Sequence, residues 1–296
     1  MLKRREQLKL TAALAALSAL SVPALAQTLP QPLRFGVVPY LPARRLAVLF
    51  EPVRAMFERQ LQVPVQFHLA SDYHAHLEML RRREYDLTAD ALIFSRIAQR
   101  QFGYLPLART QAPLQPVLVT RRGTAAPHSA QTQPATPDLR ALRSQTLAVS
   151  DGFATLTVIA MRYLRDNGLR PGTDVRVSVA GSHANAMQLV LLGQAQAAVV
   201  SLTALRQVDP ATAAQLHIIY ELPAALSAVV YLLAPRLAHL APTLAPALLH
   251  FANQQTAGRA FIETLGHQGL LPVGPELAQV DPLVVEFYRL LAQGGL

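Results

Sequence analysis

The chain has 296 residues, of which 51% are hydrophobic and 15% are charged, and it contains no Cys. The apolar fraction excludes a mainly disordered chain, and the lack of Cys excludes disulfide bonds, thiolate metal sites and a cysteine nucleophile. The net charge of +9 at pH 7 would by itself favour a nucleic-acid or membrane partner. Part of that charge, however, lies in the first residues, which have the character of a targeting segment.

The N-terminus reads as a secretory signal peptide over residues 1–26. Four basic side chains precede or begin an apolar run at 10–22, and the sequence ALA at 24–26 supplies the small residues of a cleavage site. The apolar run is too short to span a membrane comfortably, so a membrane anchor is the weaker alternative. Cleavage after Ala26 leaves 23 Lys and Arg against 17 Asp and Glu, a net charge of +6 on 270 residues. We therefore expect an exported, periplasmic protein that binds no nucleic acid.

The hydrophobic pattern of the mature chain predicts alternating strands and helices. Short apolar runs predict strands at 33–38, 63–70, 86–94, 115–123, 146–151, 175–181, 195–201, 217–222 and 227–234. Apolar residues at helical spacing predict helices at 46–61, 71–85, 95–102, 155–169, 183–194, 242–256 and 282–293. A polar, Pro-bearing loop is expected at 124–138. The order strand, helix, strand, helix, strand occurs twice, which indicates two α/β units with parallel strands and a cleft at their carboxyl ends.

Common catalytic motifs are missing from the sequence, including G-x-S-x-G, H-E-x-x-H, the Walker loop and G-x-G-x-x-G. The segment DYHAHLE at 72–78 offers two i,i+4 pairs of potential metal ligands, but these lie on different faces of one helix. A metal site needs three or four ligands, so we interpret this segment as a solvated helix face. The sequence predicts no enzyme, no metal and no cofactor.

Two segments have the pattern of an anion-binding turn. SDGFATLT at 150–157 ends a strand and opens a helix, and GSHAN at 181–185 repeats this arrangement. Free N–H groups and the positive end of a helix dipole attract phosphate-like groups at such a turn. The alternative is ordinary helix capping by Ser150, Asp151 or Ser182. The side chains expected to contribute to ligand binding are Ser150, Thr155, Thr157, Ser182 and His183.

Further short motifs extend over nearly the whole mature chain. FGVVPY opens it at 35–40, LQVPV follows the first helix at 61–65, and DYHAHLEMLR at 72–81 precedes a Tyr-Asp strand. LAVSDGFATLT, VAGSHANAMQLVLLGQAQAAVV and FIETLGHQGLLPV follow in order. In this combination the chain resembles the PhnD-like family, the periplasmic phosphonate-, phosphite- and phosphate-binding proteins of ABC importers.

The resemblance implies a two-lobe, type II periplasmic-binding fold with two hinge crossings, near 113–117 and 222–228. Lobe 1 would comprise residues 27–115 plus 227–296, and lobe 2 residues 116–226. It implies a monomeric receptor that captures a small oxyanion or related polar solute for an ABC permease. One alternative is a periplasmic module that presents its ligand to a membrane-bound signalling kinase. Another is an enzyme on this fold, for which the sequence offers no nucleophile and base.

The functional residues of the family carry over only in part. Tyr40 stands where the family has a residue at the pocket mouth, Thr155 matches the threonine of the S-T-S-G turn, and His183 matches the G-x-H histidine. Asp90 or a neighbouring residue replaces a family tyrosine, and Gln196 replaces the carboxylate that holds a ligand amine. Ala154, Leu156 and Thr157 replace the remaining Ser, Ser and Gly of the turn. These departures predict a ligand other than 2-aminoethylphosphonate.

Overall fold

The computed structural model describes residues 29, 31–123 and 139–294. The described residues from Pro32 onward form one compact unit. The predicted signal peptide and the predicted loop at 124–138 lie outside the described residues. Within the described ranges, no helix is both long enough and apolar enough to cross a membrane.

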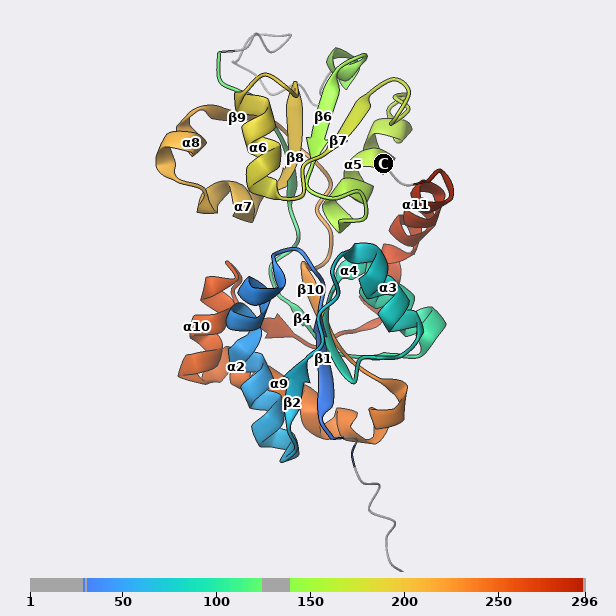
Figure 1. Cartoon of the computed structure of the whole chain (residues 1–296), viewed down its shortest axis with the longest axis vertical. Coiled ribbons are helices and arrows are strands. Elements are labelled where there is room, and N and C mark those ends of the chain that lie inside the picture. Colours follow the sequence, from blue (N-terminus) through green and yellow to red (C-terminus); the bar gives the residue numbers. More distant parts are fainter. Residues whose placement is uncertain (1–28, 30, 124–138, 295–296) are drawn as a thin grey trace, which may run out of the picture. The chain divides into compact units, whose positions relative to one another are not determined.

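The first sheet has six strands in the order β11-β4-β10-β3-β1-β2. They are β1 (Leu33–Val37), β2 (Val65–Phe67), β3 (Leu87–Ala91), β4 (Leu105–Thr110), β10 (Val229–Leu233) and β11 (Leu270–Leu271). β1 is parallel to β2 and β3, whereas β10 is antiparallel to β3 and β4. On one side of this sheet lie the helices α2 (Ala43–Leu61), α9 (Ala241–Gln254) and α10 (Thr256–Thr264), and on the other α3 (Tyr73–Arg81) and α4 (Leu92–Ile97) (Figure 1).

The second sheet has five strands in the order β7-β6-β8-β5-β9. They are β5 (Pro116–Arg121), β6 (Thr146–Val149), β7 (Arg176–Val179), β8 (Ala197–Ser201) and β9 (Leu216–Glu221). Successive side chains of a strand point to opposite faces, so a strand that is apolar throughout needs a cover on both. Accordingly, Leu147 and Val149 pack with α5 (Thr155–Asp166), and Ala148 packs with α6 (His183–Leu191).

The chain crosses between the two sheets twice, once between β4 and β5 and once between β9 and β10. Leu114 and Ala225 exchange both backbone hydrogen bonds, at 3.0 and 2.9 Å, so the two crossing segments pair with each other. The parallel pairing of β6 with β7 and β8 matches that of β1 with β2 and β3. The predicted two-lobe α/β fold with two crossings is confirmed.

Several elements differ from the sequence-based prediction. A strand through residue 94 is wrong from Leu92 onward, because Leu92–Phe94 open α4, in which all but Arg96 is buried. A helix buried on nearly all sides has no amphipathic spacing and looks like a strand in sequence. The pattern also missed β4, β11 and α10. Shorter elements are α7 (Leu202–Gln207), α8 (Pro210–Ala214), a π-helix at Ala98–Phe102, and 3-10 helices at Leu139–Leu142, Pro235–Leu240 and Pro275–Val280.

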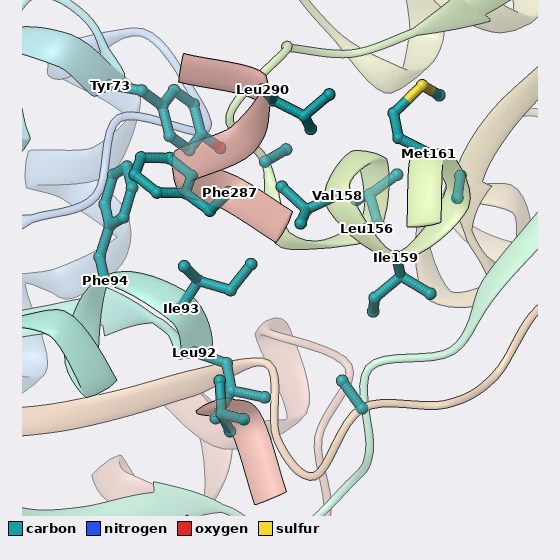
Figure 2. Close-up of a cluster of buried hydrophobic side chains, with 14 of the residues drawn as sticks. Tyr73, Leu92, Ile93, Phe94, Leu156, Val158, Ile159, Met161, Phe287 and Leu290 are labelled. Atoms are coloured by element: carbon teal, nitrogen blue, oxygen red, sulfur yellow. The ribbon is translucent and has the colours of Figure 1, made fainter. Parts of the chain in front are cut away.

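The last helix, α11 (Asp281–Ala292), packs against both α4 and α5. Its buried residues Phe287 and Leu290 belong to one apolar cluster that includes Phe94 of α4 and Leu156 of α5 (Figure 2). Helix α11 therefore joins an element of the first sheet to an element of the second.

Candidate functional site

The first turn of α5 carries buried hydroxyl groups without a partner. Thr155 and Thr157 are 4% and 0% exposed, and neither hydroxyl has a hydrogen-bond partner in the described part of the chain. The N-cap residue is Ala154, so no side chain caps this helix. The first N–H groups of a helix have no intrahelical acceptor, and those of Thr155 and Leu156 find none elsewhere among the described residues. This helix end therefore presents several donors without acceptors.

The turn before α5 is stabilised from within. Ser150 is buried at the end of β6, and the carboxylate of Asp151 accepts the N–H of Phe153 at 2.7 Å. Burial raises the pKa of Asp151, and this hydrogen bond opposes the shift. Asp151 thus stabilises the turn but does not cap α5. The hydroxyl groups of Thr155 and Thr157 therefore take no part in capping the helix.

The N-terminus of α6 lies at the same edge of the second sheet. Ser182 caps this helix, because its hydroxyl accepts the N–H of Asn185 at 3.1 Å. The Nδ1 atom of His183 is buried without a partner among the described residues. Burial lowers the pKa of His183 to about 4, so its imidazole is neutral at pH 7. Val149 of β6 pairs with Val179 of β7, so both turns leave from adjacent strands about 5 Å apart.

Three tyrosines belong to the first sheet and the segments around it: Tyr40 after β1, Tyr73 in α3 and Tyr231 in β10. Tyr231 of β10 is fully buried, and its hydroxyl has no partner in the described ranges. Burial raises the pKa of Tyr40, Tyr73 and Tyr231, and Tyr40 lies close enough to add to the pKa shifts of the other two. Asp151 also raises the pKa of Tyr73, which places the turn before α5 beside α3. Sequence reasoning missed Tyr73 and Tyr231, because a tyrosine in an apolar run looks like an ordinary core residue.

Asp90 belongs to a buried polar network. Its two carboxylate oxygens bond to Nε2 of His76 and to the hydroxyl of Thr88, both at 2.7 Å, and the Tyr85 hydroxyl lies 3.0 Å from Nδ1 of His76. His76 and Asp90 are both 0% exposed, so the interpretation of 72–78 as a solvated helix face is wrong for His76. The apolar core contact of His76 with Phe94 accounts for its burial. No three His, Cys, Asp or Glu side chains gather as possible metal ligands among the described residues.

Gln196 lies at the opposite edge of the second sheet. It is exposed and precedes β8, and its N–H donates to the carbonyl of Thr146, the first residue of β6. Ser150 follows the other end of β6, about 13 Å farther along the strand. The structure therefore brings Tyr40, Ser150, Thr155, Thr157, Ser182 and His183 to the carboxyl ends of the strands, but not Gln196.

Two α/β sheets joined by two crossings, with unpartnered donors at the carboxyl ends of the strands, define a substrate-binding protein of the two-lobe type. The model of the family described as "ABC transporter, phosphonate, periplasmic substrate-binding protein" matches residues 35–277. The chain belongs to this family. It is therefore a periplasmic substrate-binding protein of an ABC importer, and the family favours this function over the kinase-linked sensor.

Solved structures share this fold at low sequence identity. PhnD1 from Prochlorococcus marinus, in complex with methylphosphonate, is 14% identical with a TM-score of 0.74, over 87% of this chain and 98% of that chain. A binding protein component of an ABC phosphonate transporter from Pseudomonas aeruginosa is 16% identical with a TM-score of 0.70, over 88% of each chain. The alkanesulfonate-binding protein SsuA from Xanthomonas axonopodis, bound to MOPS, is 16% identical with a TM-score of 0.56, over 87% and 94%. No curated protein matches the sequence significantly.

Proposed function

We propose that the protein captures a small phosphonate-like oxyanion between Thr155, Thr157 and His183 of the second sheet's helices and the tyrosines of the first sheet. One observation carries the proposal: four buried polar atoms, the hydroxyls of Thr155, Thr157 and Tyr231 and Nδ1 of His183, have no partner among the described residues. Buried polar groups in native proteins are nearly always hydrogen-bonded. The unpartnered groups in the first turns of α5 and α6, which follow strand ends, therefore favour a ligand that supplies the acceptors.

The chemistry of these groups favours an anion with several oxygen atoms. Each hydroxyl donates one hydrogen bond, and a neutral imidazole donates through one ring nitrogen. The helix end of α5 adds backbone N–H groups and a positive partial charge. Methylphosphonate, bound by PhnD1, and MOPS, bound by SsuA, each carry a tetrahedral oxyanion.

We also propose an export signal, an oligomeric state, lobe boundaries and a partner for this protein. Residues 1–26 direct export and are removed, and the mature chain acts as a monomer with lobes 27–115 plus 227–296 and 116–226. The protein delivers its ligand to a permease in the inner membrane and catalyses no reaction. The proposed ligand site comprises Tyr40, Tyr73, Ser150, Thr155, Thr157, Ser182, His183 and Tyr231.

A thermal-shift screen of the mature chain tests this function. The probes are methylphosphonate, phosphite, phosphate, methanesulfonate and acetate. A ligand at about 100 times its Kd stabilises the folded state by about 2.7 kcal/mol, so a bound anion raises Tm by several degrees. We expect a shift with at least one tetrahedral oxyanion, and loss of that shift in Thr155→Val. Flat curves with all four tetrahedral anions, confirmed by calorimetric titration, would contradict the proposal.

A further inference from the structure

Four aromatic rings form a continuous chain from α3 to the turn before α5. Tyr73 packs edge-on against Phe94 of α4, with ring centroids 5.9 Å apart. Phe94 packs against Phe287 of α11 at 5.5 Å, and Phe287 packs against Phe153 of the turn, also at 5.5 Å. Tyr73, Phe94 and Phe287 lie side by side in Figure 2. Phe287 is 1% exposed, so its contacts with Phe94 and Phe153 are made by a buried ring.

One end of this aromatic chain, Tyr73, belongs to the proposed ligand site, and the other end, Phe153, lies in the turn that precedes Thr155. Phe153 lies two residues before Thr155, and the backbone N–H of Phe153 donates a hydrogen bond to the carboxylate of Asp151. At the other end, Tyr73 lies close to both Asp151 and Tyr40. Of the four rings, Phe287 is the one that contacts both α4, through Phe94, and the turn before α5, through Phe153. Phe287 itself lies outside the proposed ligand site.

Ion pairs fix α11 against both neighbouring helices. The guanidinium of Arg96 in α4 donates to the two carboxylate oxygens of Asp281, at 2.6 and 2.9 Å. Arg165 of α5 forms an ion pair with Glu286, which is 2% exposed. Because Glu286 precedes Phe287 directly, a shift of that ring would disturb a buried charge, which is costly. The ring of Phe287 is thus held in place from two directions.

We propose that Phe287 is a positioning residue for the ligand site. Its ring keeps Phe153 and Phe94 in fixed orientations, and so presets the donors of the first turn of α5 relative to Tyr73 before the anion arrives. Groups that are ordered in advance lose less entropy on binding, which strengthens affinity without any new contact. This inference rests on the proposed function for its effect on affinity, whereas its effect on the turn before α5 does not.

The experiment compares Phe287→Leu with Phe261→Leu in the mature chain. Phe261 is 3% exposed and packs against Phe50 with centroids 5.5 Å apart and an interplanar angle of 67°, which closely matches the 5.5 Å and 61° of Phe153 and Phe287. The control removes the same kind of ring contact between α2 and α10, outside the aromatic chain. Hydrogen exchange of peptides covering residues 150–157 is measured in the ligand-free protein, together with Tm.

We expect exchange over 150–157 to be about tenfold faster in Phe287→Leu than in Phe261→Leu, because the edge-on contact of Phe287 with Phe153, which holds the turn, is lost. The Kd for methylphosphonate should weaken by a similar factor in Phe287→Leu alone. Equal exchange over 150–157 in the two variants would overturn the inference. If Phe287→Leu does not fold, Phe153→Leu removes the same contact from the turn and is judged by the same comparison. If the wild type binds none of methylphosphonate, phosphite, phosphate and methanesulfonate, the proposed function fails, while the exchange data still decide the role of Phe287.

Discussion

Replacing Thr157 with valine should make the ligand-free protein more stable and its ligand binding weaker. Thr157 is 0% exposed, and its hydroxyl has no partner among the described residues. In a helix a threonine hydroxyl can bond a carbonyl of the preceding turn, but here it does not. Leaving a buried hydroxyl unpaired costs about 1–3 kcal/mol. Valine keeps the branched shape and removes this cost, so Tm of the ligand-free protein should rise by about 2–6 °C.

The same substitution removes a donor from the proposed anion site. A hydrogen bond to a charged group contributes about 1.5–3 kcal/mol, so the Kd for a bound oxyanion should weaken about 10-fold to 150-fold. Thr110→Val is the matched control for stability. Thr110 is also 0% exposed, but its hydroxyl accepts the N–H groups of Ala228 and Val229 at 3.0 and 3.2 Å. Its removal leaves two buried donors unpaired and should lower Tm.

Calorimetric titration with methylphosphonate gives the Kd, and differential scanning calorimetry gives Tm. The reasoning is refuted if Thr157→Val lowers Tm as Thr110→Val does and leaves the Kd unchanged. That result would mean that the hydroxyl of Thr157 is paired in solution and is not reserved for a ligand.

Three further substitutions test other parts of the structure. The folded-state pKa of His183, about 4, lies below the 6.5 of an unfolded chain, so the unfolded state binds the proton first and stability falls as pH drops from about 6.5 to 4. Between pH 7.5 and pH 5, the free energy of unfolding measured in urea should therefore fall by up to about 2 kcal/mol less in His183→Gln than in the wild type. An equal fall in both proteins would rule this out. Tyr231→Phe removes an unpartnered buried hydroxyl, so it should keep or raise Tm while weakening binding of methylphosphonate about tenfold in titration; an unchanged Kd would place Tyr231 outside the site. Gly36→Ala would bring a Cβ to 2.6 Å from the Tyr85 ring, which should cost about 1–3 kcal/mol in urea unfolding, and an unchanged midpoint would show that the ring moves freely.

Local patterns were sufficient for the strands and helices that repeat in the two α/β units. β1, β6 and β8 are short apolar runs that end in polar or turn residues, and α5 and α6 follow strands after small or capping residues. The pattern failed at α4, because burial on nearly all sides removes the alternation on which such patterns depend. It also missed β4, because its run LPLART contains Pro106, Arg109 and Thr110, and because it pairs with β10, which is distant in sequence.

The residues of the proposed site also differ in how far the sequence alone predicted them. The two helix-opening turns were visible in the sequence because strand ends, Thr155, Thr157 and His183 are local features. Asp90 and Gln196 were assigned by comparison with family motifs alone. Their actual neighbours, His76 for Asp90 and Thr146 for Gln196, follow from the packing of α3 on the first sheet and from strand pairing in the second.

The sequence by itself determined the two α/β units, the export signal as an expectation, and the family to which the chain belongs. These properties depend on residues close together in the chain or on a pattern carried along its length. Only the tertiary structure decided which polar groups lack partners, because a hydrogen bond between distant residues leaves no periodic trace. It also decided that Phe287, near the C-terminus, packs between Phe94 and Phe153. That contact joins three segments distant in sequence, and the packing of α11 on α4 and α5 produces it.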